Sequence, residues 1–364
     1  MTELRVALVQ EPSDLPAGWD AACRRYADRL GVALTVHAAG PDDLSAALRQ
    51  AAAADGVLLH SGAAASDPAL ARTVADLRGR VVHVEPDPVT GAPGPVREAC
   101  DRALHGRGRG TCRWALQHLR ANAQRPAATR PYGTAPDQVG DLRLPDGDGP
   151  YPVAVLLHGG FWLDPWERDL MDGVAVDLTD RGWATWNLEY RRLGRSGGGY
   201  PTTFDDVAAG ISHLAVLTRE HPLDTRRVTL VGHSAGGALA MWAATRPTGV
   251  TVERLVVLAG VLDLPAAARD GLGLGSVTAL LGDPDDRAAD YAQVSPVTLA
   301  PVGAPTLLVH GTADDHVQAS HSERYAAVAR AGGDAIDLVL LDGVDHFSLI
   351  DPDAAAWATT VAHL

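Results

Sequence analysis

Short apolar runs recur along the whole chain, and in its first third they alternate with segments that carry apolar residues at helical spacing. The runs predict buried strands over residues 5–9, 33–37, 57–60 and 81–84. The segments around them predict helices over residues 19–30, 44–54, 68–77 and 114–120. Strands and helices that alternate at this spacing imply right-handed crossovers and a parallel sheet. We therefore predict an α/β domain over residues 1–121.

A second α/β domain is predicted over residues 132–364, after a proline-containing linker at residues 122–131. Its apolar runs predict buried strands over residues 153–157, 228–231, 255–258, 306–309 and 337–341. Several of these runs end in polar, glycine-containing turns. The candidate chemistry of the chain lies in those turns.

The strand predicted at residues 228–231 leads into Gly232-His233-Ser234-Ala235-Gly236 and then into a segment of good helix formers. A serine at the apex of such a tight turn has a strained backbone, and the flanking glycines keep side chains from colliding there. The turn lifts the serine hydroxyl above the sheet edge and aims the first amides of the next helix at the same point. The pattern therefore predicts a nucleophile elbow, with Ser234 as the nucleophile.

The strand at residues 153–157 leads into His158-Gly159-Gly160-Phe161-Trp162. Glycines let the backbone approach a substrate, so we expect amides near Gly160 and Phe161, with that of Ala235, to form an oxyanion hole. One such donor typically stabilises the transition state by about 3 kcal/mol. The sequence leaves open which of the two upstream amides contributes more.

A serine hydroxyl is a weak nucleophile and needs a base and an orienting acid. His346 follows the strand at residues 337–341, and an unperturbed pKa of about 6.5 lets an imidazole accept and return a proton near neutrality. The strand at residues 306–309 leads to Asp314 and Asp315. We predict Asp314 as the acid, since the carboxylate in such a turn arrives a few residues after the glycine. Asp315 is the alternative, with capping of the helix that starts near Ala319 as its other role.

These motifs resemble the α/β-hydrolases of the esterase and kynurenine formamidase branch, and the resemblance covers residues from about 130 to the end. The segment 158–162 is similar to the His-Gly-Gly-x-Trp signature of that branch. The blocks at Tyr132-Gly133, 187–191, 232–237 and 345–347 also match. The hormone-sensitive-lipase branch has a third glycine where Phe161 stands, which argues against membership of that neighbouring branch. The resemblance implies the fold and the chain order Ser, Asp, His, but one signature serves formamides, carboxylic esters and other acyl groups.

Residues 4–120 resemble type II dehydroquinases, which have a flavodoxin-like fold. The resemblance rests on the segments 55–63, 81–84 and 106–110. Where that family has its catalytic histidine this chain has Ser66, and its asparagine is replaced by His60. Its His-x-Ser-Asn block is His83-Val84-Glu85-Pro86 here. A dehydration that needs a general acid and base cannot run without those groups, so we expect a domain that has lost its active site.

Composition favours a soluble cytoplasmic enzyme. The chain of 364 residues is 46% hydrophobic, without an unbroken apolar run near the roughly 18 residues of a membrane span. Its first residues lead into a strand and show no signal-peptide pattern. A formal charge of −14 argues against nucleic acid and anionic membranes as partners. The three cysteines, an odd number, suit a reducing compartment.

Several residues near strand ends are candidates for the substrate pocket. Trp162 and Tyr190, with Trp166 and Tyr200, could form an aromatic acyl or aryl pocket, although such residues are often simply core. Asp263 could line the pocket or cap a helix. The glycine-rich segment 271–275 is assigned to a cap insertion, because no βαβ unit frames it as a dinucleotide loop requires. The histidines at 310, 316 and 321 lack the pairing of a zinc motif, so we expect neither metal nor cofactor.

The sequence therefore predicts an N-terminal flavodoxin-like parallel-sheet domain followed by an α/β-hydrolase domain. The expected function is hydrolysis of a small-molecule ester or aryl amide by a Ser234–His346–Asp314 triad. Two other functions stay open: an acyltransferase on the same triad, or a scaffold with a vestigial site. The N-terminal domain could support a homo-oligomer.

Overall fold

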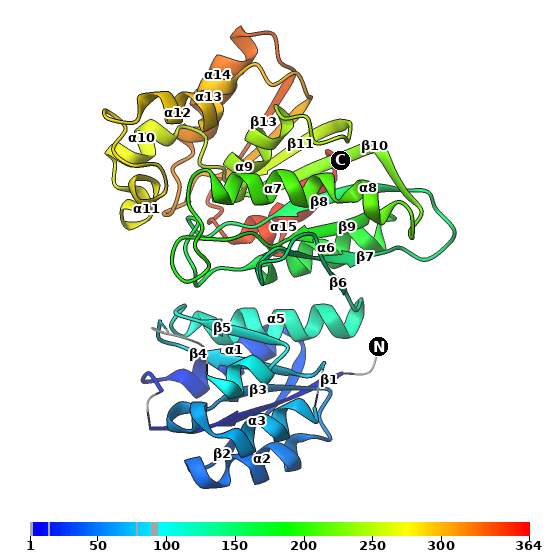
Figure 1. Ribbon diagram of the computed structural model, residues 1–364, viewed down its shortest axis with the longest axis vertical. Coiled ribbons are helices and arrows are strands. Elements are labelled where there is room, and N and C mark those ends of the chain that lie inside the picture. Colours follow the sequence, from blue (N-terminus) through cyan, green and yellow to red (C-terminus); the bar gives the residue numbers. More distant parts are fainter. Residues whose placement is uncertain (1–2, 14, 78, 89–93) are drawn as a thin grey trace. The chain divides into compact units, whose positions relative to one another are not determined.

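The computed structural model describes residues 3–13, 15–77, 79–88 and 94–364. The chain divides into two compact units, Met1–Pro126 and Ala127–Leu364, and each is described by itself. In Figure 1 the first unit is coloured blue to cyan and the second turquoise to red. No helix in the described part of the chain is both long and apolar enough to cross a membrane.

The first unit is built on a five-stranded sheet in the order β2-β1-β3-β4-β5, with all neighbouring strands parallel. The strands are β1 (Leu4–Gln10), β2 (Val32–Ala38), β3 (Gly56–His60), β4 (Val81–Glu85) and β5 (Arg102–His105). Every residue of β3 is buried, as expected for a central strand covered by helices on both faces. The predicted parallel α/β sheet is present.

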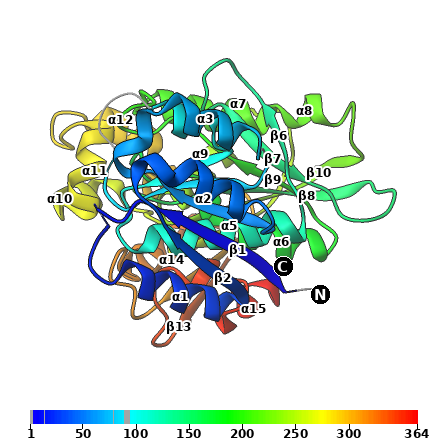
Figure 2. The ribbon, with the colours of Figure 1, turned by 90° about the horizontal axis from the view of Figure 1, so that it is seen from below.

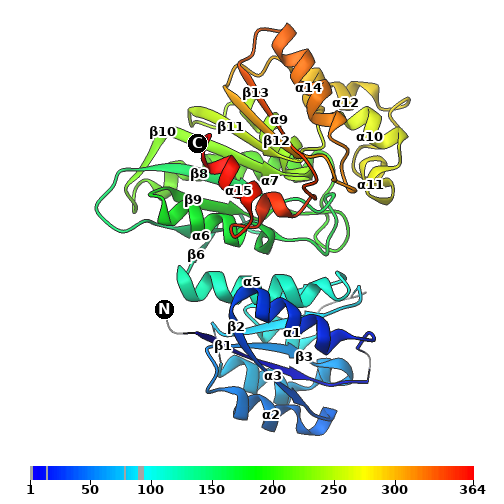
Figure 3. The ribbon, with the colours of Figure 1, turned by 180° about the vertical axis from the view of Figure 1, so that it is seen from behind.

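Helices cover both faces of this sheet. The helices are α1 (Trp19–Leu30), α2 (Leu44–Ala51), α3 (Pro68–Ala75), α4 (Pro95–Ala99) and α5 (Gly110–Gln124). Figure 3 shows α1 and α5 on one face and α2 and α3 on the other, and Figure 2 shows β1 and β2 running between these layers. Helix α1 ends where the sequence indicates, because Gly31 adopts the left-handed conformation that closes a helix (φ 62°).

The second unit is built on an eight-stranded mixed sheet in the order β13-β12-β11-β10-β8-β9-β7-β6. The strands are β6 (Ala128–Pro131), β7 (Val139–Arg143), β8 (Tyr151–Leu157), β9 (Ala184–Leu188), β10 (Leu223–His233), β11 (Val252–Leu258), β12 (Thr306–Gly311) and β13 (Ile336–Leu341). Strand β7 is antiparallel to both of its neighbours, β6 and β9, and the six strands from β13 to β9 in this order run parallel to one another. The carboxyl ends of β8, β10, β11 and β12 consequently meet at one edge.

The helices of this unit pack on both faces of its sheet. They are α6 (Asp172–Asp180), α7 (Thr202–Ser212), α8 (Leu214–Leu217), α9 (Ala235–Ala244), α14 (Ser320–Ala331) and α15 (Ala355–Val361). Helices α6 and α15 share one face, where Trp357 Nε1 donates to Asp177 Oδ2 at 2.8 Å. The expected cap insertion between β11 and β12 folds into α10 (Leu264–Arg269), α11 (Leu272–Leu281), α12 (Ala288–Val294) and α13 (Pro296–Leu299).

The structure differs from the sequence prediction at several places, among them the buried strand β9, which was not predicted. Residues 122–131, predicted as a linker, contain the last turn of α5 and the whole of β6, so only residues 125–127 there lack regular structure. Strand β5 was not predicted, because it is short and begins with a buried arginine, Arg102. Strand β7 was not predicted, since it carries Asp141 and Arg143, which are buried in ion pairs with Arg168 and Asp172.

Candidate active site

Ser234 lies between β10 and α9, in the strained backbone conformation that the turn requires (φ 57°, ψ −120°). Such a conformation in a non-glycine residue costs about 1–3 kcal/mol and persists only when the surroundings enforce it. Here the Ser234 N–H donates to the Leu258 carbonyl at 2.8 Å, and the Ser234 carbonyl accepts from Gly237 N at 2.9 Å and Val261 N at 3.2 Å. Backbone on both sides therefore holds the strained turn.

Glycines are required on both sides of this serine. A Cβ at Gly236 would collide with the Leu157 carbonyl oxygen, and a Cβ at Gly232 would collide with the Gly236 carbonyl oxygen. Close approach of β8, β10 and α9 thus leaves no room for a side chain at either position. The same approach places Gly159 against the nucleophile, since a Cβ there would lie 2.8 Å from Ser234 Cβ.

His346 and Asp314 meet through a short hydrogen bond, in which His346 Nδ1 donates to Asp314 Oδ2 at 2.6 Å. The other carboxylate oxygen of Asp314 accepts from His316 N at 2.9 Å and Val317 N at 2.8 Å. The Asp315 carboxylate is 83% exposed and bonds to His316 Nδ1 at 2.7 Å. The structure thus brings His346 together with Asp314 and not with Asp315.

Electrostatics keeps this pair in the protonation states that a base and its orienting acid need. Burial alone would raise the pKa of Asp314, but hydrogen bonds from His310 and His346 hold that pKa well below its usual range. Burial lowers the pKa of His346 from 6.5, against the opposing effect of Asp314. A neutral imidazole beside an ionised carboxylate is the state in which His346 can accept a proton.

Sequence reasoning missed the supporting role of His310. His310 Nε2 donates to the Val317 carbonyl at 2.8 Å and lies 3.4 Å from Asp314 Oδ2, while Nδ1 pairs with the Ser322 hydroxyl at 2.8 Å. It thereby fixes the loop that carries Asp314. The available signal was a histidine at the end of β12, four residues before the acid.

His233, the residue before the nucleophile, supports the base. Its Nε2 donates to the His346 carbonyl at 3.2 Å, and the two ring centroids lie 4.5 Å apart. Burial lowers the pKa of His233 well below the usual value, so the ring stays neutral beside His346. The sequence offered no signal for this contact beyond the identity of the residue.

The Ser234 hydroxyl is buried and has no hydrogen-bond partner among the residues that the structure describes. Catalytic hydrogen bonds are often long in free enzymes and tighten when substrate binds. The amide of Ala235 begins α9 and has no partner within that helix. A donor is thus available next to the nucleophile.

The loop after β8 carries the other two predicted donors. Gly160, Phe161 and Trp162 all have positive φ angles (108°, 53° and 59°), so the chain turns sharply at the nucleophile. Phe161 also contacts the cap insertion, because a Cβ at Gly273 would lie 2.5 Å from the ring. We call residues 158–162 the oxyanion loop.

Of the candidate pocket residues, Trp162 and Tyr190 lie in the core, and Asp263 has the helix-capping role that the sequence left open. Trp162 and Tyr190 are fully buried in the hydrophobic core and expose no surface to a ligand. Asp263 accepts from Ala266 N at 3.0 Å as the cap of α10 and pairs with Arg324 Nη1 at 2.5 Å. Packing in the core covers the two rings, and hydrogen bonds within the scaffold occupy the Asp263 carboxylate.

The rings around the base include one of the candidate pocket residues, Trp166, and two residues that were not predicted there, His316 and Phe347. His316 stacks on His346 at 4.9 Å with an interplanar angle of 9°, and Phe347 meets both rings edge-on. Trp166, half-buried, stacks on Phe347 at 6.0 Å. An aromatic rim of Trp166, Phe347 and His316 thus lies beside the catalytic pair.

One group of candidate metal ligands occurs in the described chain, namely Asp314, Asp315 and His316, whose ligand atoms lie within 4.8 Å of one another. Two of its members are exposed, and the Asp314 oxygens already accept hydrogen bonds from His346 and from backbone amides. The Asp314 carboxylate of this group therefore serves the catalytic pair.

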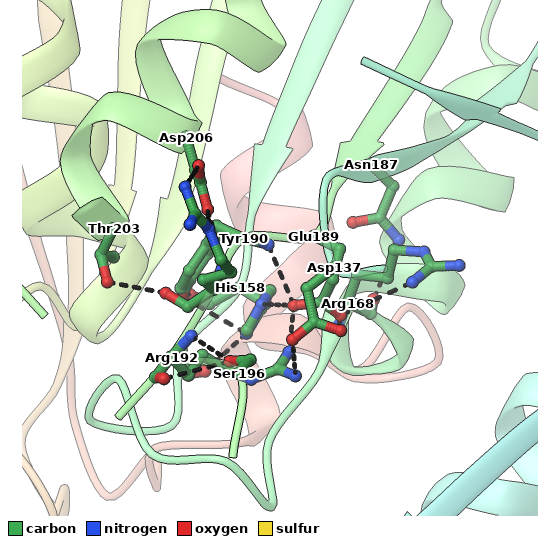
Figure 4. Close-up of polar contacts among 12 residues, drawn as sticks. Asp137, His158, Arg168, Asn187, Glu189, Tyr190, Arg192, Ser196, Thr203 and Asp206 are labelled. Atoms are coloured by element: carbon green, nitrogen blue, oxygen red, sulfur yellow. Dashed lines mark hydrogen bonds and ion pairs between the residues drawn. The ribbon is translucent and has the colours of Figure 1, made fainter. Parts of the chain in front are cut away.

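A buried network of charged residues lies behind the oxyanion loop (Figure 4). At its centre, the Glu189 carboxylate pairs with Arg192 and accepts from His158 Nε2 at 3.0 Å and from Arg168 N at 3.0 Å. Arg192 Nη2 also bonds to Asp137 at 3.1 Å. Burial alone would raise the pKa of Glu189, but Arg192, His158 and Arg168 lower it, so the group is a carboxylate.

The fold and this site define the class of the protein, which is an α/β-hydrolase of the serine-dependent kind that cleaves carboxylic esters or amides. Residues 141–328, just over half of the chain, match the family model BD-FAE. The chain belongs to the BD-FAE family.

Curated relatives are enzymes of this class. The chain is 26% identical over 219 residues to kynurenine formamidase of Drosophila melanogaster, covering 56% of this chain and 68% of that protein. It is 25% identical over 238 residues to a probable isoprenylcysteine α-carbonyl methylesterase of Oryza sativa subsp. japonica, covering 59% of this chain and 56% of that protein. The match thus spans about two thirds of one relative and little over half of the other.

Solved structures show the same fold at low identity. The acetyl ester-xyloside bifunctional hydrolase of Caldicellulosiruptor lactoaceticus has a TM-score of 0.55 and 20% identity, over 65% of this chain and 93% of that one. Esterase 2 of Thermogutta terrifontis, phosphonylated by sarin, has a TM-score of 0.55 and 18% identity, over 65% and 92%. At such identities the likeness concerns the fold alone.

Proposed function

We propose that this protein hydrolyses small carboxylic esters or aryl formamides through an acyl-enzyme on Ser234, with His346 as the base and Asp314 as its orienting acid. The observation that carries the proposal is the 2.6 Å hydrogen bond between His346 Nδ1 and Asp314, formed in the same unit as the strained turn at Ser234. Nucleophile, acid and base follow one another in the chain order of this fold.

The chemistry follows from these positions. Ser234 Oγ attacks the substrate carbonyl carbon while its proton passes to His346 Nε2, and the carbonyl electron pair moves to oxygen. The amides of Ala235 and the oxyanion loop donate to that oxygen. The leaving alcohol or amine takes the proton from His346, and water then repeats the sequence on the acyl-enzyme.

The substrate class rests on two supports. One relative is a kynurenine formamidase and the other a probable methylesterase, so small acyl groups and small leaving groups both suit the family. The aromatic rim of Trp166, Phe347 and His316 lies beside the base, which is where a leaving group receives its proton. We propose a formyl or short-chain acyl group on an aromatic leaving group as the substrate.

Activity on nitrophenyl esters is expected to fall as the acyl chain lengthens from acetate and butyrate to decanoate, and N-formyl arylamines should be cleaved. The measurement is kcat/KM for each ester and amide with purified protein. A preference for decanoate over acetate would contradict the proposed substrate class. Adding a short alcohol tests the acyltransferase alternative. If the new ester forms faster than the free carboxylic acid, the reaction is acyl transfer and not hydrolysis.

For residues 1–121 we propose a flavodoxin-like domain that derives from a dehydroquinase and has lost its catalytic groups. The strand order 2-1-3-4-5 supports the fold. His60 Nδ1 donates to the Glu11 carbonyl at 2.8 Å, and His83 pairs with the Ser61 hydroxyl at 2.8 Å. Burial lowers the pKa of His83 to about 4, so the ring serves as a neutral structural group.

Dehydroquinate is therefore expected neither to bind nor to react. Calorimetric titration with dehydroquinate and an assay of its dehydration test this, and turnover abolished by His60→Ala or His83→Ala would make the chain bifunctional.

We further propose that the domain serves assembly in a cytoplasmic protein. Removing residues 1–126 should then change the oligomer size measured by light scattering more than it changes the chemistry at Ser234.

A further inference from the structure

Successive carbonyl groups of the oxyanion loop are held by hydrogen bonds. The His158 carbonyl accepts from the Tyr190 hydroxyl at 2.7 Å, the Gly159 carbonyl from His158 Nδ1 at 2.8 Å, and the Gly160 carbonyl from Leu163 N at 3.0 Å. A trans peptide is planar, and its N–H points opposite to its C=O. Holding the Gly159 carbonyl consequently fixes the direction of the Gly160 N–H, one of the predicted oxyanion donors.

The ring that holds the Gly159 carbonyl is itself fixed by a hydrogen bond and by stacking. His158 is fully buried, and its Nε2 donates to Glu189 Oε1 at 3.0 Å. Since Nδ1 and Nε2 both face oxygens that can only accept, both nitrogens carry a proton, and the Glu189 carboxylate balances the charge of the ring. Its ring stacks on Tyr190 with centroids 4.3 Å apart and an interplanar angle of 6° (Figure 4). The Glu189 carboxylate is in turn held by Arg192 and by the Tyr190 N–H at 3.1 Å. The ring has one direction in which to donate through Nδ1, and that is toward the Gly159 carbonyl.

Stability alone is a weak reason for such a network. Replacing a buried ion-pair cluster by apolar residues of similar volume is often neutral or stabilising, because the desolvation of the charges offsets their attraction. A network that must hold one peptide plane has a different requirement, since a donor misplaced by a fraction of an ångström loses much of its effect on the transition state.

We infer that His158 is a positioning residue for catalysis: held by Glu189 and Tyr190, it fixes the Gly159–Gly160 peptide plane and so aims the Gly160 N–H at the oxyanion. The inference rests on the proposed serine mechanism and adds to it. It also answers a point that the sequence left open, because it names Gly160 as the upstream donor that the network controls.

The test is His158→Phe, which keeps a ring against Tyr190 and leaves Glu189 paired with Arg192 and Arg168 but removes both polar contacts of the imidazole. Loss of one oxyanion donor lowers turnover by about 100- to 1,000-fold. We expect that fall in kcat on nitrophenyl acetate, with KM changed by less than about threefold, because the donor acts mainly in the transition state.

A second readout follows the oxyanion itself. Trifluoroacetophenone accepts Ser234 Oγ at its carbonyl carbon, the serine proton passes to His346, and the carbonyl electron pair becomes an anionic oxygen in the hole. Its inhibition constant should rise in His158→Phe by about the factor by which kcat/KM falls. A merely structural role for His158 would not make the inhibition constant and kcat/KM change by the same factor.

Two further variants keep the test decisive. Tyr190→Phe removes the hydroxyl that holds the His158 carbonyl and that also lies 3.4 Å from His158 Nδ1. It leaves the Gly159 carbonyl bonded to His158, so it should cost less than about tenfold in kcat. Asp172→Asn is the matched control, since it weakens a different buried ion pair, Arg143–Asp172, and should lower the melting temperature with kcat unchanged.

The possible results distinguish failure of the proposed function from failure of the positioning role. A parent enzyme that is inactive and unlabelled by a fluorophosphonate would remove the proposed function itself. An active parent whose His158→Phe variant keeps its kcat would overturn the positioning role alone. If His158→Phe does not fold, Tyr190→Phe decides. A fall in its kcat as large as that expected for the loss of an oxyanion donor would show that any loosening of the oxyanion loop lowers turnover. That result would contradict specific control of the Gly159–Gly160 peptide plane by His158.

Discussion

Ser234→Ala is expected to lower turnover by about a millionfold while the protein stays folded, because the members of a serine triad act as a unit. The hydroxyl has no hydrogen-bond partner among the described residues, so its removal leaves no buried group unpaired. The backbone bonds to Leu258, Gly237 and Val261 that hold the turn do not involve the side chain. The measurement is kcat on nitrophenyl acetate, with the melting temperature recorded alongside.

Ser212→Ala is a suitable control for this variant. Ser212 is an exposed helix serine that bonds to the Ala208 carbonyl at 2.8 Å. Its loss should leave kcat unchanged. Residual activity of the Ser234 variant within about tenfold of the parent would mean that another group carries the reaction.

Asp314→Asn is expected to lower kcat by about 10,000-fold, because an asparagine cannot hold the imidazole in the productive tautomer. Asp315→Asn is the matched control, and it should change kcat by less than about threefold, since an exposed carboxylate contributes little. The two residues are neighbours in sequence, but the Asp315 carboxylate faces His316 and solvent. If Asp315→Asn proves the more damaging change, the acid has been misassigned.

The pH profile gives the same pair a second test. The pKa of His346 is lowered from 6.5 by burial. Protonation removes the base, so kcat/KM of the parent should fall as the pH drops through a value below 6.5 and stay level just above it. Asp314 raises the pKa of His346, so Asp314→Asn should move this acidic limb to lower pH still. An unmoved limb would show that another group titrates there.

Much of the second unit could be predicted from the sequence because its central strands are buried on both faces. Runs such as 153–157 and 307–309 are apolar throughout, so the type and position of these strands can be predicted without tertiary information. Each ends at a glycine-containing turn, and parallel strands bring those turns to one edge. That is why Asp314 and His346, thirty-two residues apart, could be paired before the structure was known.

The supporting residues could not be predicted, because their roles depend on partners distant in sequence. Glu189 and Arg168 are charged side chains in the interior, which hydropathy assigns to the surface. Asp141 in β7 is buried only because Arg168 reaches it at 2.7 Å. A buried charge becomes acceptable once its counter-charge is in place, and a linear sequence does not show that pairing.

Trp162 and Tyr190 were mispredicted as pocket residues for a related reason. Aromatic residues after strand ends were expected to face the ligand, yet Trp162 turns inward at a positive φ of 59° and lies in the core. The rings that do lie beside His346, among them His316 and Phe347, come from loops whose paths only the fold determines.

Covalent labelling of the nucleophile is the most direct test of the central claim, that Ser234 forms an acyl-enzyme with His346 and Asp314. Intact-mass spectrometry after treatment with an alkyl fluorophosphonate should show one adduct on the parent, located at Ser234 by peptide mapping. The adduct should be absent from Ser234→Ala and form at least about 1,000-fold more slowly in Asp314→Asn. No labelling of the parent, or labelling that persists in Ser234→Ala, would contradict the account.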